Sequence, residues 1–154
     1  MNRRQIRHEV FLTLFEWSFR KDEAVLDLLA ARVPDTREEG DSYAKTVCTG
    51  VCSRDEDLND IITRYSIGWE VARISKVPLI AMKIALYEIL YMPDIPVNVS
   101  INEAVEIVKE YEGRDSAGFI NGILGNYIRT EKDKLPLKIE MGCEKRPGGK
   151  EAGE

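Results

Sequence analysis

The stretch KVPLIAMKIALYEILYM, residues 76–92, decides the fold of this chain because it is the most apolar segment of the sequence. Its hydrophobic residues occupy nearly every side of a helical wheel, so a helix formed here has to be buried among other elements. Pro78 falls in the first turn, where a missing N–H group costs nothing. The stretch therefore predicts a central helix that other helices surround.

Segments on both sides of this central helix carry a helical pattern, with apolar residues recurring three and four positions apart. The run IPVNVSI, residues 95–101, is compatible with an extended chain, but a single strand cannot form a sheet. The sequence therefore predicts an all-α fold, a compact single-domain bundle of six to seven helices. The other helices are expected at about 3–19, 23–32, 42–53, 55–65, 100–112 and 115–129.

Polar residues at the expected helix starts predict specific caps. Asp55 is a good N-cap for the helix that follows it, and Asp115 or Ser116 is expected to cap the last helix. Ser100 and Glu103 have the spacing of a capping box, in which each side chain satisfies a backbone N–H group. This spacing indicates a structural role for Glu103.

Glycines interrupt the pattern of the last helix, each at a cost of roughly 0.5–1 kcal/mol relative to alanine. Gly118 and Gly122 lie one turn apart and form a strip without side chains, on which the central helix can lie closely. A second interpretation is that Gly118 leaves room for an RNA backbone near Asp115. Close packing is the favoured interpretation.

Length and composition indicate one domain with a buried core, since the chain has 154 residues and 44% of them are hydrophobic. We expect this domain to span residues 1–134. Residues 135–154 are rich in proline, glycine and charge, and we expect them to form a disordered polar tail. No apolar run reaches about 18 residues, so no membrane span is expected. Three cysteines without framework spacing predict a cytoplasmic protein.

The sequence argues against an enzyme. It contains one histidine, His8, and has no glycine-rich phosphate loop, dinucleotide-binding fingerprint or His/Cys metal cluster. Cys48 and Cys52 lie one helical turn apart, but buried thiols are favoured over metal ligands because there is no second pair. No catalytic residue, metal ion or cofactor is therefore expected.

The charge distribution permits RNA binding at one end of the protein. A net charge of −5 argues against nonspecific coating of nucleic acid. However, Arg3, Arg4 and Arg7 precede the first acidic residue, Glu9. Their spacing places Arg3 and Arg7 on one side of a helix, where both can reach adjacent phosphates. The alternative is an ordinary solvated helix start.

Three segments resemble the NusB family of bacterial transcription antitermination factors in their order and spacing. They are RRQIRHEVFLTLFEW (3–17), VPLIAMKIALYEILYMPDIPVNVSINEAVEIVKEY (77–111) and DSAGFINGILGNYI (115–128). The resemblance implies an all-helical, non-catalytic protein that binds the boxA element of nascent ribosomal RNA. It also implies that NusE, a small-subunit ribosomal protein, binds the same RNA, and that the pair joins an RNA polymerase antitermination complex.

The resemblance also implies which residues contact RNA. Arg3, Arg4 and Arg7 match the basic motif that begins the first helix of the family. Asp115 and Phe119 match RNA-proximal positions at the start of the last helix. There, free N–H groups can meet a phosphate and an aromatic ring can stack on an unpaired base. A core position is the alternative for Phe119.

Further candidates flank the central helix. Lys76 and Lys83 can extend the basic surface, with an ordinary solvated face as the alternative. Phe15, Phe19 and Pro78 match positions at which the family contacts NusE, and a core position is the alternative for the two phenylalanines. Pro78 stands where the family often has an acidic residue, so a salt bridge to the partner is not expected here.

Two other functions share this fold. One is a helical adaptor that binds a protein partner without recognising RNA. The other is a ribosome-assembly factor, because a similar domain precedes the catalytic domain of a ribosomal RNA cytosine methyltransferase. An apolar patch meant for a partner can also pair with itself, so a homodimer is a further possibility.

Overall fold

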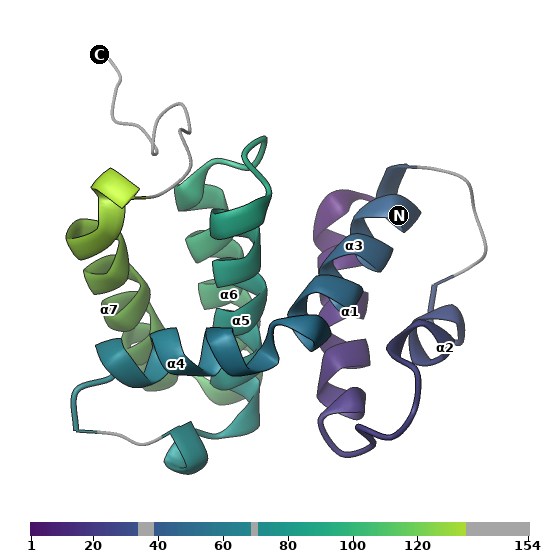
Figure 1. Ribbon diagram of the computed structural model, residues 1–154, viewed down its shortest axis with the longest axis horizontal. Helices are drawn as coiled ribbons and strands as arrows, with labels where there is room; N and C mark the ends of the chain where they lie inside the picture. The colour runs from purple at the N-terminus through teal and green to yellow at the C-terminus, as the bar shows by residue number, and fades with distance from the viewer. Residues whose placement is uncertain (34–38, 69–70, 135–154) are drawn as a thin grey trace.

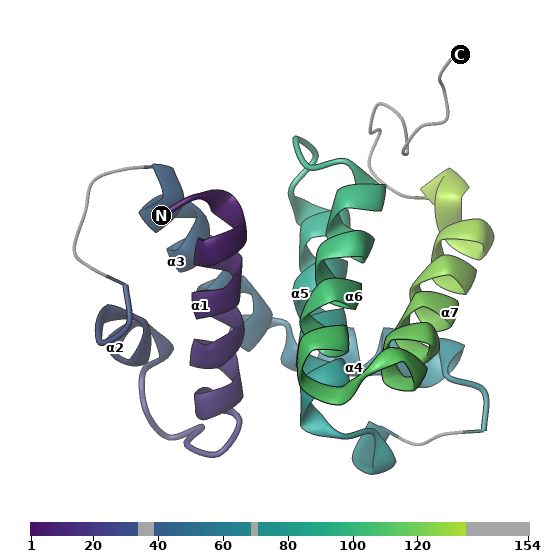
Figure 2. The same cartoon turned by 180° about the vertical axis from the view of Figure 1, so that it is seen from behind.

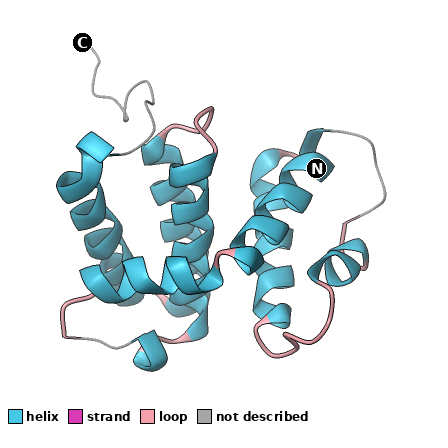
Figure 3. Cartoon of the chain, viewed as in Figure 1, coloured by secondary structure: helices cyan, strands magenta, loops and turns pink. Residues whose placement is uncertain are grey.

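The computed structural model describes residues 1–33, 39–68 and 71–134, and every regular element within these ranges is a helix (Figure 3). The prediction of an all-α fold is confirmed. The predicted tail at 135–154 lies outside the described residues. The α-helices are α1 (Arg3–Trp17), α2 (Val25–Ala30), α3 (Glu39–Ser53), α4 (Asp55–Tyr65), α5 (Lys76–Tyr91), α6 (Val97–Glu112) and α7 (Arg114–Glu131), and the 3-10 turns are η1 (Val71–Arg73) and η2 (Lys132–Lys134).

The apolar helix α5 occupies the centre of the bundle, as predicted. It runs antiparallel to α6, which in turn runs antiparallel to α7, while α4 crosses these helices (Figures 1 and 2). The helices α1, α2 and α3 form a second group, and both α1 and α3 pack against α5. The side chains of Met82, Leu86 and Ile89 on α5 are each 1% exposed or less. Burying these apolar surfaces is the main stabilising contribution to the fold.

The predicted caps do not occur, and other residues start the helices. The helix α6 begins at Val97, after an N-cap at Pro96, so residues 97–101 of the run that was compatible with an extended chain are helical, and Ser100 is not a cap. The helix α4 begins at Asp55 itself, after Arg54. Gly113, with φ +91°, precedes α7 and allows the sharp change of direction from α6.

The predicted packing role of the glycines in α7 is wrong. A Cβ atom added at Gly118 or Gly122 would meet no atom within 4 Å, so neither glycine provides a close helix contact. Close contact occurs instead at Gly50 on α3. A Cβ atom there would lie 2.1 Å from the ring of Tyr87 on α5. Glycine at position 50 therefore lets α3 and α5 approach each other.

None of the described helices is both long and apolar enough to cross a membrane.

Candidate RNA and partner interface

A capping box fixes the start of α1, where the predicted arginines lie. The side chain of Asn2 accepts a hydrogen bond from the N–H of Gln5 at 2.8 Å. The side chain of Gln5 accepts one from the N–H of Asn2, also at 2.8 Å. Two N–H groups that a helix start leaves unpaired are satisfied in this way. The capping box thereby sets the directions in which Arg3, Arg4 and Arg7 leave the helix.

The three arginines have different environments. Arg3 is exposed, and its Cζ lies 4.3 Å from the ring centroid of Tyr43. The side chain of Arg4 is 70% exposed, but it donates to Glu103 through Nε at 3.1 Å and Nη2 at 2.7 Å. The side chain of Arg7 is only 4% exposed. Arg7 therefore does not present the surface cation that its spacing from Arg3 predicted.

Arg7 belongs to a buried polar cluster centred on Glu88 of α5, whose side chain is fully buried. The carboxylate accepts from Arg7 Nε at 2.8 Å, Arg7 Nη2 at 3.3 Å and Ser100 Oγ at 2.7 Å. The Tyr43 hydroxyl also donates to it. Burial opposes the charge of Arg7, but the contacts with Glu88 raise the pKa of the guanidinium overall. The buried carboxylate of Glu88 on α5 thus accepts hydrogen bonds from side chains on α1, α3 and α6, and these bonds hold the four helices together.

Lys83 is likewise buried, and does not extend the predicted basic surface. Its side chain is 9% exposed, and Nζ donates to Asp55 at 2.6 Å. Lys21 contacts the same carboxylate at 3.3 Å. Burial lowers the pKa of Lys83. Burial also acts to raise the pKa of Asp55, but its contacts with the two lysines lower it overall. The Lys83–Asp55 pair holds α4 against α5.

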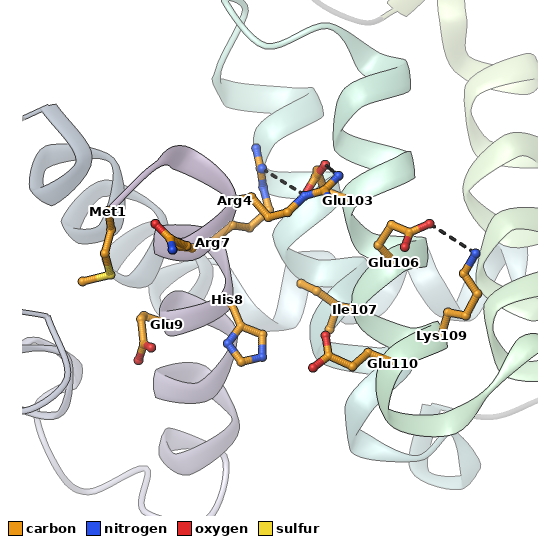
Figure 4. A pocket seen from close by; sticks show the side chains of 11 residues that line it. Met1, Arg4, Arg7, His8, Glu9, Glu103, Glu106, Ile107, Lys109 and Glu110 are labelled. Carbon is orange, nitrogen blue, oxygen red and sulfur yellow. Dashed lines mark hydrogen bonds and ion pairs between the residues drawn. The ribbon is translucent and has the colours of Figure 1, made fainter.

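A groove of about 530 Å³ lies between α1 and α6, with Arg4 on its wall (Figure 4). On its α6 side, Lys109 pairs with Glu106 at 3.3 Å. His8 stacks on Tyr111 near the same helix boundary, with ring centroids 5.8 Å apart. The groove is rich in carboxylates, so it attracts phosphate groups weakly and is better suited to hydrogen-bonding base edges. Its acidic lining residues are Glu9, Glu103, Glu106 and Glu110.

The predicted partner-binding aromatics lie at the opposite end of α1. Phe19 follows the C-terminus of α1 and is 64% exposed. The ring of Phe15 is half-buried, and its centroid lies 5.3 Å from that of Phe19. Nζ of Lys76, at the start of α5, lies 4.8 Å from the Phe19 ring centroid. The structure thus places Lys76 beside the predicted partner surface, away from Arg3 and Arg4.

A second cavity brings together residues predicted for RNA and for the partner. Pro78, Asp115 and Phe119 line this space of about 300 Å³, where α5 and α7 begin. Pro78 is buried, Phe119 is half-buried and packs against the core, and Asp115 is exposed. Phe119 therefore combines core packing with access to a cavity, whereas the sequence offered these as alternatives.

Glu88 and Glu103 are the residues of this region that sequence reasoning missed or misassigned. Glu103 pairs with Arg4 rather than completing a capping box with Ser100. Glu88 had one sequence signal, because it is an acidic residue within the apolar run IALYEIL, where a charge is expected to be paired. The identity of its partners depends on tertiary structure.

Comparison with known proteins identifies the family of this chain. The NusB family profile matches residues 4–129. The chain belongs to the NusB family. Curated relatives named "Transcription antitermination protein NusB" include one from Carboxydothermus hydrogenoformans, 40% identical over 142 residues, covering 88% of this chain and 97% of the relative. The relative from Acetivibrio thermocellus is 37% identical over 134 residues, covering 85% of this chain and 91% of the relative.

Solved NusB structures share the fold. NusB of T. maritima is 34% identical and superposes with a TM-score of 0.78, covering 88% of this chain and 99% of that one. A crystal structure of antitermination factors NusB and NusE in complex with dsRNA matches with a TM-score of 0.73 at 21% identity, covering 84% of this chain and 99% of the matched chain. This NusB-family protein therefore has the fold of a protein that has been crystallised with NusE and dsRNA.

Proposed function

We propose that this protein is a non-catalytic transcription antitermination factor that binds boxA-type RNA of nascent ribosomal RNA together with NusE. The pair then acts within an RNA polymerase complex, in the cytoplasm. The observation that carries this proposal is the relationship to curated NusB antitermination proteins, which are 37–40% identical over most of the chain. The fold shared with a NusB–NusE–dsRNA complex supports it.

The electrostatics of the α1 end favour joint binding with a partner. Arg3 is exposed and Arg4 reaches solvent, but Arg7 is buried and Glu103 occupies two of the five N–H donors of Arg4. The neighbouring groove adds four carboxylates. Few cations are thus available for phosphates, and phosphate contacts supply much of the affinity of RNA-binding proteins. NusE would supply the remaining contacts by extending the shared surface.

Residues at the C-terminal end of α1 are assigned to the partner, and residues at the start of α7 are assigned to RNA. Phe15 and Phe19 offer an apolar surface to NusE, with Lys76 beside it. Asp115 and Phe119 line the neighbouring cavity, where an unpaired base could stack. Because Pro78 lines the same cavity, NusE and RNA would meet there.

Fluorescence anisotropy of a labelled boxA RNA tests the proposal, with a scrambled RNA as the control. The titration uses the protein alone and with NusE, at two salt concentrations. We expect boxA to bind more tightly than the control, and NusE to strengthen that difference. Equal binding to both RNAs with NusE still bound would indicate a protein-binding adaptor instead. Sedimentation at several protein concentrations tests the separate question whether the free protein is a monomer or a homodimer.

A further inference from the structure

Two arginines lie over tyrosine rings on the side of the molecule formed by α1, α3 and α5. Arg3 Cζ is 4.3 Å from the ring centroid of Tyr43, and Arg54 Cζ is 4.3 Å from that of Tyr91. Within the described part of the chain, neither arginine forms an ion pair with a carboxylate. A hydrogen bond with Tyr91 raises the pKa of Arg54. Guanidinium groups held in this way keep donors free for another ligand.

The two tyrosine rings are held in place from the core. The hydroxyl of Tyr43 donates to the buried carboxylate of Glu88. The ring of Tyr91 packs on Tyr87, with centroids 5.0 Å apart, and Tyr87 lies against Gly50. The surface is therefore preorganised, which lowers the entropic cost of binding a ligand.

Gly50 lies next to both Tyr87 and Arg54, and so connects the tyrosine pair with the arginine that it supports. The N–H of Arg54 donates to the carbonyl oxygen of Gly50 at 3.1 Å, which places Arg54 one turn beyond Gly50, between the end of α3 and the start of α4. The absence of a side chain at position 50 thus brings Tyr87 and Tyr91 within reach of Arg54.

A shallow cavity of about 310 Å³ lies beside these rings. It is lined by Arg3, Tyr43 and Tyr91 together with the loop after α5, and Asp94 is the carboxylate among its described lining residues. The groove on the other side of α1 has four lining carboxylates. In a protein of net charge −5, this side of Arg3 is thus the less repulsive path for a polyanion.

We propose that Arg3, Arg54 and Tyr91, with the buried ring of Tyr43 supporting Arg3, form a second RNA-contacting surface, which binds unpaired nucleotides flanking the boxA element. The guanidinium planes and the exposed Tyr91 ring, which is 43% exposed, stack on bases, and the arginine N–H groups contact phosphates. The surface is continuous with the α1 arginines through Arg3. This inference rests on the proposed function, because boxA brings the RNA to Arg3.

Anisotropy titrations with three RNAs test the inference, using the complete chain with NusE. The RNAs are boxA alone, boxA with an unpaired 5′ extension and boxA with an unpaired 3′ extension. We expect one extension to tighten binding on the order of tenfold, the effect of stacking about one base. Arg54→Ala and Tyr91→Ala should each remove most of this gain and leave binding of boxA alone unchanged. Tyr91→Phe should retain it.

Arg129→Ala is the control variant, because it removes one exposed positive charge from α7, a helix that contributes no residue to this surface or to the lining of its cavity. Circular dichroism melting curves verify that each variant is folded. The inference is wrong if neither extension tightens binding, or if the gain in affinity survives in both alanine variants. In that case, specific binding of boxA alone would still support the proposed function. If boxA alone does not bind, both fail. Loss of NusE binding in the variants would make this a protein interface and overturn the RNA assignment.

Discussion

Arg4 and Glu103 are separated by 99 positions in the sequence, yet two hydrogen bonds of 2.7 and 3.1 Å join their side chains across the boundary of α1 and α6. The guanidinium of Arg4 is mostly exposed, but two of its five N–H donors are bonded to Glu103. An RNA phosphate that binds this same Nε–Nη2 edge of Arg4 therefore has to displace the carboxylate of Glu103. The pair makes Glu103 a competitor of RNA within the protein itself.

Removing the charge of Glu103 should strengthen RNA binding. In Glu103→Gln, Arg4 is released and the groove loses one negative charge, so we expect affinity for boxA RNA to rise severalfold, in line with the modest strength of exposed ion pairs. The salt dependence of log K should steepen by about 0.7, the value for one additional phosphate contact on a single strand. Anisotropy titrations across a salt series measure both quantities.

Glu106→Gln is the matched control, because Glu106 lines the same groove but pairs with Lys109 instead of an arginine. An equal gain in both variants would mean that general repulsion limits binding, and would contradict a specific role for the Arg4–Glu103 pair.

Breaking the buried pair of Arg7 and Glu88 should destabilise the fold. In Arg7→Met, the carboxylate of Glu88 stays buried without its cationic partner, and we expect the free energy of unfolding to fall by about 3–5 kcal/mol. Urea denaturation followed by circular dichroism measures this loss. Arg4→Ala, which removes the solvent-exposed cation of the pair with Glu103, should lower the free energy of unfolding far less. Because removing the Arg7 side chain is expected to destabilise the fold, a variant at Arg7 cannot be used to measure surface contacts in RNA-binding assays.

Alanine substitutions should separate the two kinds of glycine in the helices. Gly50→Ala forces the ring of Tyr87 to move, and overpacking of this kind costs about 1–3 kcal/mol of unfolding free energy. Gly122→Ala meets open space in a helix interior and should stabilise the protein by roughly 0.5–1 kcal/mol. Chemical denaturation of both variants tests this expectation. Equal effects on unfolding would argue against the close contact of α3 and α5.

The Asp55–Lys83 pair should make stability depend on acid pH. The pKa of Asp55 is lowered in the folded protein, so its contribution is complete above the ordinary aspartate value of about 3.9. As the pH falls below about 4, the unfolded chain binds the proton first, and the contribution is lost as the pH falls through the folded pKa. The difference in unfolding free energy between the natural protein and Asp55→Asn should therefore shrink between pH 6 and pH 3.

Asp57→Asn provides the comparison for this titration, because Asp57 is an exposed carboxylate in the same turn of α4. The difference in unfolding free energy between Asp57→Asn and the natural protein should stay small between pH 6 and pH 3. A constant difference for Asp55→Asn over the same range would contradict the lowered pKa.

Local sequence patterns predicted most of the helices. The segment 55–65 was expected and observed, and α5 ends one residue before its predicted limit, because apolar periodicity reports directly on a buried helix face. The start of α6 was placed too late. Val97 and Ile101 pack toward the core on a helix that begins immediately after Pro96, a residue well suited to precede a helix.

The candidate site was less predictable, because its residues are defined by partners distant in the sequence. Spacing on one helix placed Arg3 and Arg7 on the same side, but it could not show that Arg7 is buried against a carboxylate 81 positions away while Arg3 stays exposed. Likewise, a glycine within a helical pattern does not indicate whether another helix lies against it. Gly50 has such a neighbour in Tyr87, whereas Gly118 and Gly122 have none within 4 Å.

The buried cluster around Glu88 also constrains how the sequence can evolve. A substitution at position 7 or position 88 alone leaves an unpaired charge in the interior. The resulting loss of unfolding free energy is a large part of the roughly 5–15 kcal/mol by which domains are usually stable. A matched apolar pair at both positions could restore stability, but it lies two substitutions away through a poorly folded intermediate. Positions 7 and 88 should therefore be inherited as a unit, and recombination between related genes that separates them should yield chimaeras that fold poorly.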